Sequence, residues 1–416
     1  MEGCSERGPR NVSIGFSPDT PTPSGHGHRR IVLLRPLDDH RSAPHAITEE
    51  RDHRSGREWV GALKVSLSED QRAVEELFSE FFAKTSEPMV VRRAEPLGFD
   101  SELWSKLCAL DAPAMGVAAD KGGGGAALSD LVVLGECVGR AVAPVPIIEH
   151  AVAVRALPEP SPELLGGDEI ATLALHAPTG GLHWGLIPAG AVARTVVGPC
   201  DEATVAVSAE PPGVSPANHA CMPVAFRTFE HDAATTVGDK SVWSRALSEW
   251  QILTAASLVG IAAKSLDIGV KYVKSREQFG RPIGSFQAVQ HGLADLPGFI
   301  DGARLLTFKA AWAMDTSDTS DPNVPTTTNV DDNEVNDPTS LALMAYLFAT
   351  EVAAQVTDRV LHYHGGYGFA EEYDIGLYYR RARGWPLVLG DPAAQYQRLA
   401  DQLFGAVSTD DVSRKR

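Results

Sequence analysis

The chain has 416 residues, of which 44% are hydrophobic and 22% charged. It is long enough for two or three ordinary domains, and its composition excludes a wholly disordered protein. Lys and Arg number 37 and Asp and Glu number 54, which gives a formal net charge of −17. Such an acidic chain is a poor candidate for binding nucleic acid phosphates or anionic lipid over a broad surface.

The five cysteines show neither a CxxC pair nor a zinc-type spacing with histidine, and they are Cys4, Cys108, Cys137, Cys200 and Cys221. This pattern predicts reduced thiols in a cytoplasmic protein and no metal site. His362 and His364 lie two residues apart and face different ways on a helix, so they predict no metal site either. Because we find no apolar run of about 18 residues and no apolar leader, we expect neither a membrane span nor a secretory signal.

Residues 1–60 are rich in Pro, Ser, His and Arg without periodicity, and we expect a disordered extension or a start codon assigned too early. From residue 64 to 160 the sequence predicts a helical domain. Ser68 and Gln71 have the spacing of a capping box, and the apolar residues that follow recur at helical intervals. A later helix is predicted over Leu128–Val142, ended by prolines.

Residues 168–240 have a different pattern of residue types from the helical segment before them. Short β-branched segments alternate there with Gly and Pro, for example Ile170–Leu175 and Thr204–Ser208. Such spacing is typical of strands joined by tight turns. We expect a small middle β-domain, either an antiparallel barrel or a sandwich.

Residues 244–408 predict a second helical domain. A wide apolar face runs to Ser275, and a second long helix is expected over Phe286–Ala313 with a kink at Pro297. Residues 315–338 hold seven acids and no base, which predicts a solvated loop, and a third helix follows to His362. The order helices, strands, helices predicts an α+β multidomain protein.

Two segments carry the residues with chemical potential, Ser275–Gln287 and His364–Phe369. Each is a glycine-containing turn at a helix terminus, where backbone N–H groups can approach an anion. Arg276 and Arg281 could add bidentate contacts to phosphate. By themselves these residues favour plainer alternatives, namely a helix–turn–helix with solvated charges and a glycine C-cap.

Longer stretches around these turns resemble the acyl-CoA dehydrogenase family. The sequence REQFGRPIGSFQAVQHGLADL (276–296) is highly specific to that family, and HGGYGFAEEYDIGLYYRRAR (364–383) matches its second C-terminal signature. The resemblance covers roughly residues 65–408. It implies an N-terminal helical domain, a middle β-domain and a C-terminal four-helix bundle, with FAD bound between domains and across a subunit interface.

The resemblance also implies roles for individual residues. Arg276 matches the residue that holds the FAD pyrophosphate of the neighbouring subunit, and Phe279 and Gln287 match positions lining that FAD. Along the ADP portion the matching positions are His362, where Gln is usual, Gly365 and Gly366. The implied reaction is α,β-dehydrogenation of an acyl-CoA thioester, in which a glutamate removes the α-proton and the β-hydrogen leaves as hydride to the flavin. An electron-transferring flavoprotein is the implied acceptor.

The catalytic glutamate has two known locations in the family. At the first, in Val388-Leu389-Gly390-Asp391, this chain has Leu389, which cannot take a proton. At the second, near the start of the long helix before Arg276, the matching position is Trp250. Glu249 is one residue away, an offset of about 100° on a helix. Glu249 is therefore our candidate base, and the alternative is a solvated acid in the first helical turn.

The middle domain lacks the family's Thr-Glu-Pro and Trp-x-Thr-Asn strands that hold the flavin ring. These departures resemble one subunit of actinobacterial acyl-CoA dehydrogenases that work as αβ pairs on steroid side-chain or other bulky thioesters. In such pairs one subunit has a degenerate site, and its bundle helps to bind the partner's FAD. We therefore expect an FAD-dependent dehydrogenase subunit of a hetero-oligomer. Three alternatives stay open: a homo-oligomer, a catalytically silent subunit, and another flavin oxidase or monooxygenase on this fold.

A basic run, Arg380, Arg381 and Arg383, lies in the second signature. It has two interpretations. One is a solvated helix face with acidic neighbours, and the other is a contact with CoA phosphates or with a partner subunit.

Overall fold

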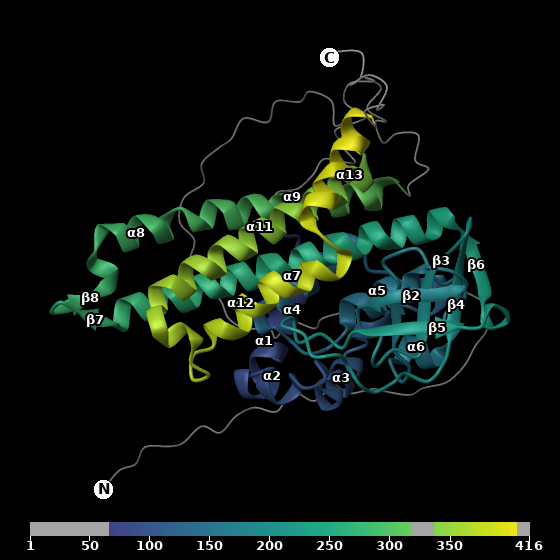
Figure 1. Ribbon diagram of the computed structural model, residues 1–416, viewed down its shortest axis with the longest axis horizontal. Helices are drawn as coiled ribbons and strands as arrows, with labels where there is room; N and C mark the ends of the chain where they lie inside the picture. Colours follow the sequence, from purple (N-terminus) through teal and green to yellow (C-terminus); the bar gives the residue numbers. More distant parts are fainter. Residues whose placement is uncertain (1–65, 318–336, 406–416) are drawn as a thin grey trace, which may run out of the picture. The chain divides into compact units, whose positions relative to one another are not determined.

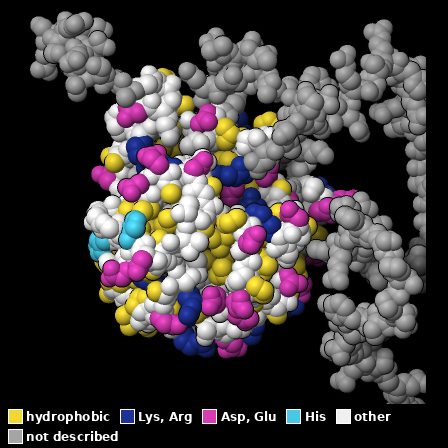
Figure 2. All heavy atoms as spheres, turned by 90° about the vertical axis from the view of Figure 1, so that its right-hand side faces the viewer, with side chains coloured by type: hydrophobic (Ala, Val, Ile, Leu, Met, Phe, Trp, Pro, Cys, Tyr) yellow, Lys and Arg dark blue, Asp and Glu magenta, His cyan; other side chains and the backbone are white. Residues whose placement is uncertain are grey.

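The computed structural model describes residues 66–317 and 337–405, all within one compact unit (Figure 1). The expectations for residues 1–60, and most of those for the acidic stretch 315–338, lie outside the described residues. Figure 2 shows the face nearest β4 and β6, where acidic and basic side chains are interspersed among hydrophobic ones. No basic patch gathers on that face.

The N-terminal part is helical, as expected, and its helices are α1 (Glu69–Thr85), α2 (Pro88–Ala94), α3 (Ser101–Cys108), α4 (Leu128–Ala141), α5 (Ile147–Ala156) and α6 (Pro162–Gly166). The predicted capping box is confirmed at the start of α1. The Ser68 hydroxyl accepts a hydrogen bond from the Gln71 N–H, and Gln71 Oε1 accepts one from the Ser68 N–H, both at 3.1 Å. Each bond satisfies an N–H group that a helix start would otherwise leave unpaired.

Six strands form the middle domain: β1 (Ala171–Leu173), β2 (Leu182–Ile187), β3 (Thr195–Cys200), β4 (Ala203–Ser208), β5 (Ala225–Phe229) and β6 (Thr235–Asp239). They make a four-stranded sheet in the order β1-β3-β4-β6 and a separate β2-β5 pair. The expectation of a wholly antiparallel domain was wrong, because β1 pairs with β3 in parallel. A second core lies here, where Trp184 and Ile187 of β2 join Val196 of β3 and Val205 of β4 in one buried cluster.

The C-terminal part contains the long helices α7 (Lys240–Ser275), α9 (Leu296–Ser317) and α11 (Pro338–His364), and the shorter α8 (Gln287–Ala294), α12 (Ile375–Gly384) and α13 (Pro392–Phe404). The single kinked helix predicted over Phe286–Ala313 is instead two helices that meet at Asp295. Pro297 lies in the first turn of α9, where its missing N–H costs nothing.

Two stretches of the described chain are long and apolar enough to cross a membrane by length and composition alone. They are α7 and Pro338–Phe369, and 78% and 61% of their most apolar 18-residue stretches are buried. Both belong to the hydrophobic core that α7 forms with α4, α5, α9 and α11. They are therefore core helices of a folded domain.

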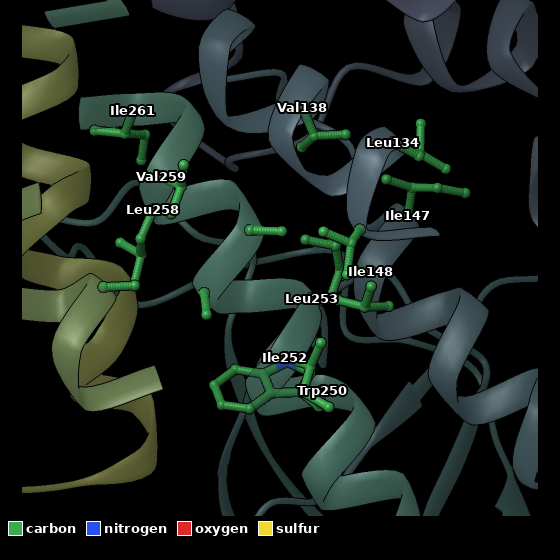
Figure 3. Close-up of a cluster of buried hydrophobic side chains, with 14 of the residues drawn as sticks. Leu134, Val138, Ile147, Ile148, Trp250, Ile252, Leu253, Leu258, Val259 and Ile261 are labelled. Carbon is green, nitrogen blue, oxygen red and sulfur yellow. The ribbon is translucent and has the colours of Figure 1, made fainter. Parts of the chain in front are cut away.

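Glycines allow α4 and α7 to approach closely. A Cβ atom on Gly139 would lie 1.8 Å from the Ser257 carbonyl oxygen, and one on Gly260 would lie 2.1 Å from the Glu136 carbonyl oxygen. Near this contact, Leu134 and Val138 of α4 belong to the same buried cluster as Leu253 and Val259 of α7 (Figure 3). The N-terminal helices and the C-terminal helices thus share one core.

We expect Gly260→Ala to lower the free energy of unfolding by about 1–3 kcal/mol, because the added methyl group has no space at this contact. Gly298 in α9 is the matched control, since a Cβ there would meet no atom within 4 Å. Gly298→Ala should be neutral or stabilising by up to about 1 kcal/mol through helix propensity. Urea unfolding of both variants measures the difference, and equal effects would contradict the packing argument.

A buried histidine connects α5, α6 and β1. The His150 side chain is fully buried, with Nε2 3.0 Å from the Leu164 carbonyl oxygen, and Nδ1 accepts a hydrogen bond from the Ala171 N–H at 3.1 Å. This network fits the neutral ring protonated on Nε2. Burial without a counter-charge lowers the pKa of His150 to about 4.

His150 should make the protein less stable in acid. Above about pH 6.5 the ring is neutral in both the folded and the unfolded chain, so it adds no pH dependence. Below that pH the unfolded chain takes up a proton that the folded protein refuses down to about pH 4, and by pH 5 the loss reaches about 2 kcal/mol. We expect urea unfolding of His150→Gln to lose this share of the pH dependence. If the free energy of unfolding of His150→Gln falls with pH as steeply as that of the parent, the assignment of a neutral, buried His150 ring is contradicted.

Candidate functional site

A short hairpin projects beyond the end of α7 (Figure 1). It consists of β7 (Glu277–Gln278) and β8 (Arg281–Pro282). Backbone hydrogen bonds fix its base, because the Arg276 N–H donates to the Tyr272 carbonyl at 2.8 Å and the Arg276 carbonyl accepts from Ile283 at 2.8 Å. At its tip Phe279 has a φ of 55° and its side chain is 91% exposed. The Phe279 ring is therefore accessible to another molecule at the tip of the hairpin.

The second signature lies beside this hairpin. At the end of α11 the chain enters a 3-10 helix, η5 (Gly365–Phe369), and a Cβ atom on Gly365 or Gly366 would meet nothing within 4 Å. The Arg276 guanidinium lies over the Tyr367 ring, 4.9 Å from its centroid. The segments Ser275–Gln287 and His364–Phe369 are therefore neighbours in space. The Arg276 cation lies close to the segment that contains the open glycines.

The remaining predicted cofactor residues lie at the same end of the helices. Gln287 is exposed at the start of α8, and the Tyr363 hydroxyl donates to the neighbouring Ala288 carbonyl at 3.4 Å. His362, one residue before Tyr363, is also exposed. Sequence reasoning missed two exposed aromatic residues of η5, Tyr367 and Phe369. Their position in a glycine-rich signature was the available signal.

The family's first base location contains no acid. Leu389 ends the 3-10 helix η6 (Trp385–Leu389), and its side chain is 1% exposed. Its carbonyl accepts a hydrogen bond from Gln395 Nε2 at 2.9 Å. Asp391 caps α13 by accepting from the Ala393 N–H at 3.0 Å. An apolar side chain and a helix cap therefore occupy this segment.

Glu249 occupies an ionic cluster. Its carboxylate accepts two hydrogen bonds from Arg155 of α5, at 2.9 and 3.1 Å, and one from Arg245 of α7 at 3.0 Å. The alternative of a solvated acid was wrong, because Glu249 is only 3% exposed. Both of its oxygens therefore already accept hydrogen bonds from guanidinium groups.

Although Glu249 and Trp250 are adjacent in sequence, their side chains line different cavities. Glu249 lines a cavity of 570 Å³ together with Gly116, Lys121 and Asp315. Trp250 lines a different cavity with Thr254 and Ser257, further along α7. The one-residue offset read from the sequence therefore directs the two side chains to different places.

The cavity beside Trp250 holds a carboxylic acid that sequence reasoning missed. The Trp250 indole N–H donates to Glu149 Oε1 at 3.5 Å, and both residues line a cavity of 60 Å³. That volume admits about two water molecules. Burial raises the pKa of the Glu149 carboxyl. The available signal was a single acid in the apolar run from Val142 to Val154.

The basic run of the second signature is partly internal. Arg381 is 2% exposed and lines the Trp250 cavity. Glu95 accepts hydrogen bonds from Arg380 at 2.5 Å and from Arg381 at 3.3 Å. The expected acidic neighbour is present as Glu95, but Arg381 is buried, so this face of α12 is not solvated along its whole length.

Comparison with known proteins agrees with this architecture. Residues 68–158 match the model of the acyl-CoA dehydrogenase N-terminal domain, and residues 241–404 match that of the C-terminal domain. The chain is 30% identical over 349 residues to acyl-CoA dehydrogenase IpdE2 of Mycolicibacterium smegmatis, which covers 81% of this chain and 100% of that protein.

Two solved structures are also similar. The structure described as the Tcur3481-Tcur3483 steroid ACAD has 27% identity and a TM-score of 0.67, and the match covers 80% of this chain and 97% of that one. The ChsE4-ChsE5 complex from Mycobacterium tuberculosis shares the fold, with 24% identity, a TM-score of 0.69 and coverage of 83% and 100%. The domain order, the two signatures and these matches agree, and the chain belongs to the acyl-CoA dehydrogenase family.

Proposed function

We propose that this protein is one subunit of a hetero-oligomeric, FAD-dependent acyl-CoA dehydrogenase in the cytoplasm. The reaction is α,β-dehydrogenation of a bulky acyl-CoA thioester, such as a steroid side chain, and the electrons pass to an electron-transferring flavoprotein. One observation carries the proposal: Arg276 lies over the ring of Tyr367, the residue that directly follows the open glycines Gly365 and Gly366. The matched family supplies the reaction class.

The residues at this end fit the FAD diphosphate. A guanidinium can bind two phosphate oxygens at once, and glycines let backbone N–H groups approach an anion closely. Exposed aromatic rings at 279, 367 and 369 offer faces on which an adenine can stack. When bound, FAD would supply the hydride acceptor. In this proposal the chain binds and orients that cofactor for a neighbouring subunit.

Two observations favour a partner of a different sequence. Leu389 occupies the first base location, and two arginines neutralise Glu249 beside the second. The similar steroid ACAD carries two protein names, Tcur3481 and Tcur3483. A subunit with an intact glutamate would supply what this chain lacks, and the FAD-binding end described above would be its contribution in return.

The proposal is tested by expressing the chain alone and together with a second acyl-CoA dehydrogenase-like chain encoded beside it. Flavin absorbance gives the FAD content, and ferrocenium reduction by cholanoyl-CoA gives the turnover. We expect FAD and turnover in the complex and neither in the lone chain. A lone chain with one FAD per protomer and full turnover would refute the hetero-oligomer, and hydrogen peroxide production would indicate a flavin oxidase.

A second candidate function is a silent subunit that only completes the partner's FAD site. The paired arginines around Glu249 and the apolar Leu389 favour it. Replacing the partner's own catalytic glutamate by Gln discriminates between the two. Loss of all turnover supports the silent subunit, and residual turnover locates a second active site on this chain.

A further inference from the structure

The Arg276 guanidinium lies at the outer end of a group of ring contacts where α7 and α11 end. It lies over Tyr367, whose ring centroid is 5.6 Å from that of Tyr373. The Tyr373 ring is nearly perpendicular to those of Tyr272 and His364, and both centroid distances are 5.9 Å. The Tyr272 and His364 rings are stacked, with their centroids 3.9 Å apart. We call these four rings the aromatic cluster.

The inner side of the aromatic cluster is fixed to the core. His364 is buried, and its Nδ1 donates a hydrogen bond to the Val360 carbonyl at 2.8 Å. The Tyr272 hydroxyl donates to the His364 carbonyl at 3.4 Å. Burial lowers the pKa of His364, so its ring is neutral at neutral pH and does not repel the Arg276 cation. The aromatic cluster therefore gives Arg276 a fixed and uncharged base.

The turn that carries Tyr373 is held from the N-terminal part of the chain. Arg92 of α2 donates a hydrogen bond to the Glu371 carbonyl at 2.6 Å and forms an ion pair with Asp374 at 2.9 Å. Within the turn, the Tyr373 N–H donates to the Ala370 carbonyl at 3.1 Å. Tyr373 is thus fixed by contacts on both sides of it in the sequence, and its ring supports that of Tyr367.

Stacking on Tyr367 leaves the hydrogen-bonding edge of Arg276 available. A guanidinium over a ring uses its flat face for the cation–π contact, whereas its N–H groups lie in its own plane. No salt bridge to Arg276 is formed within the described part of the chain, so its charge is not paired with a carboxylate there. A side chain that is already held in one orientation loses less conformational freedom when a phosphate binds.

We propose that Tyr367 and Tyr373 are positioning residues for the FAD diphosphate, because their rings hold the Arg276 guanidinium with its N–H edge directed to the phosphate oxygens. This inference rests on the proposed function. Neither tyrosine contacts the phosphate itself, so each acts only through Arg276. A lysine at position 276 has no flat face to lie on the ring. The advantage of arginine over lysine at this position therefore depends on Tyr367.

The experiment is a double-mutant cycle on the flavin-depleted complex, titrated with FAD and followed by fluorescence quenching. Tyr367→Leu, Tyr367→Phe and Tyr373→Leu are each made with Arg, Gln or Lys at position 276. Tyr379→Leu is the matched control, because the Arg383 guanidinium lies over the Tyr379 ring at 4.8 Å in α12, a contact of the same kind at another place. Circular dichroism and thermal unfolding show that each variant is folded and assembled.

We expect Tyr367→Leu to weaken FAD binding about three- to tenfold, and Tyr373→Leu to weaken it by a smaller factor. Tyr367→Phe, which keeps the ring, and Tyr379→Leu should bind FAD within about twofold of the parent complex. In the Arg276→Gln complex, Tyr367→Leu should add less than about a further twofold loss, since the residue through which it acts is gone. Arg276→Lys should weaken binding in the parent and have a smaller effect in Tyr367→Leu.

Several results would overturn the positioning role and leave FAD binding by Arg276 intact. Additive losses in Tyr367→Leu and Arg276→Gln would show that Tyr367 contacts the cofactor directly, for example by stacking on the adenine. Parental affinity in Tyr367→Leu, or an equal loss in Tyr379→Leu, would also contradict it. If Tyr367→Leu does not assemble, the same cycle with Tyr373→Leu decides the question. A parent complex that binds no FAD would instead refute the proposed function.

Discussion

Replacing Glu249 by Ala is expected to lower the free energy of unfolding by about 3–5 kcal/mol. Glu249 is 3% exposed and accepts hydrogen bonds from Arg155 of α5 and Arg245 of α7. The Arg155 side chain is 17% exposed and that of Arg245 is 33% exposed, so losing the shared carboxylate removes a charged partner from one mostly buried and one half-buried guanidinium group. The Arg155–Glu249 ion pair also links α5 of the N-terminal part to α7 of the C-terminal part. Its loss should weaken the contact between these two helices.

Urea unfolding followed by circular dichroism measures this effect. The exposed Glu159→Ala is the control and should change stability by less than about 0.5 kcal/mol. The free energy of unfolding of Glu249→Gln should lie between those of Glu249→Ala and Glu159→Ala, since an amide can accept hydrogen bonds but carries no charge. A Glu249→Ala protein with parental stability and no turnover would contradict the structural role and return Glu249 to consideration as the base.

Replacing Arg276 by Gln is expected to weaken FAD binding by the complex about ten- to hundredfold. Hydrogen bonds to charged groups contribute about 1.5–3 kcal/mol, and each 1.4 kcal/mol is a factor of ten in affinity. The guanidinium already lies over Tyr367, so it is held at the hairpin before any ligand binds. Folding should be unaffected, because Arg276 projects from the end of α7 and not into the core.

Titration of flavin-depleted complex with FAD, followed by fluorescence quenching, gives the dissociation constant. Lys274→Gln is the charge-matched control, since Lys274 is an exposed cation two residues earlier in the last turn of α7. It should bind FAD like the parent. Equal losses in both variants would show that bulk charge matters and that the specific position of Arg276 does not.

Much of the fold could be predicted from the sequence because local chemistry decides it. The Ser68–Gln71 capping box, the end of α4 before the prolines and the long apolar face of α7 all rest on neighbouring residues. The parallel β1–β3 pair could not be predicted, because strand pairing depends on contacts between segments far apart in sequence. The break at Asp295 was misplaced because proline is equally compatible with a helix start and a kink.

Part of the candidate site could likewise be predicted from the sequence, and part could not. The cofactor residues lie in two contiguous signatures, and the structure places Arg276 next to Tyr367, as two linked motifs would require. The side chains around the second base location could not be predicted from one helix alone. Glu249 and Trp250 are adjacent in sequence and face different cavities, whereas Glu149 reaches Trp250 only because α5 packs on α7.

We propose that the exposed end of α7 and α11 binds FAD for a neighbouring subunit. An experimental density map of the flavin-loaded complex tests it most directly. We expect a diphosphate within hydrogen-bond distance of the Arg276 guanidinium, alongside Gly365 and Gly366, with the flavin ring extending into the other subunit. A map in which FAD lies elsewhere while Arg276 faces solvent would contradict it.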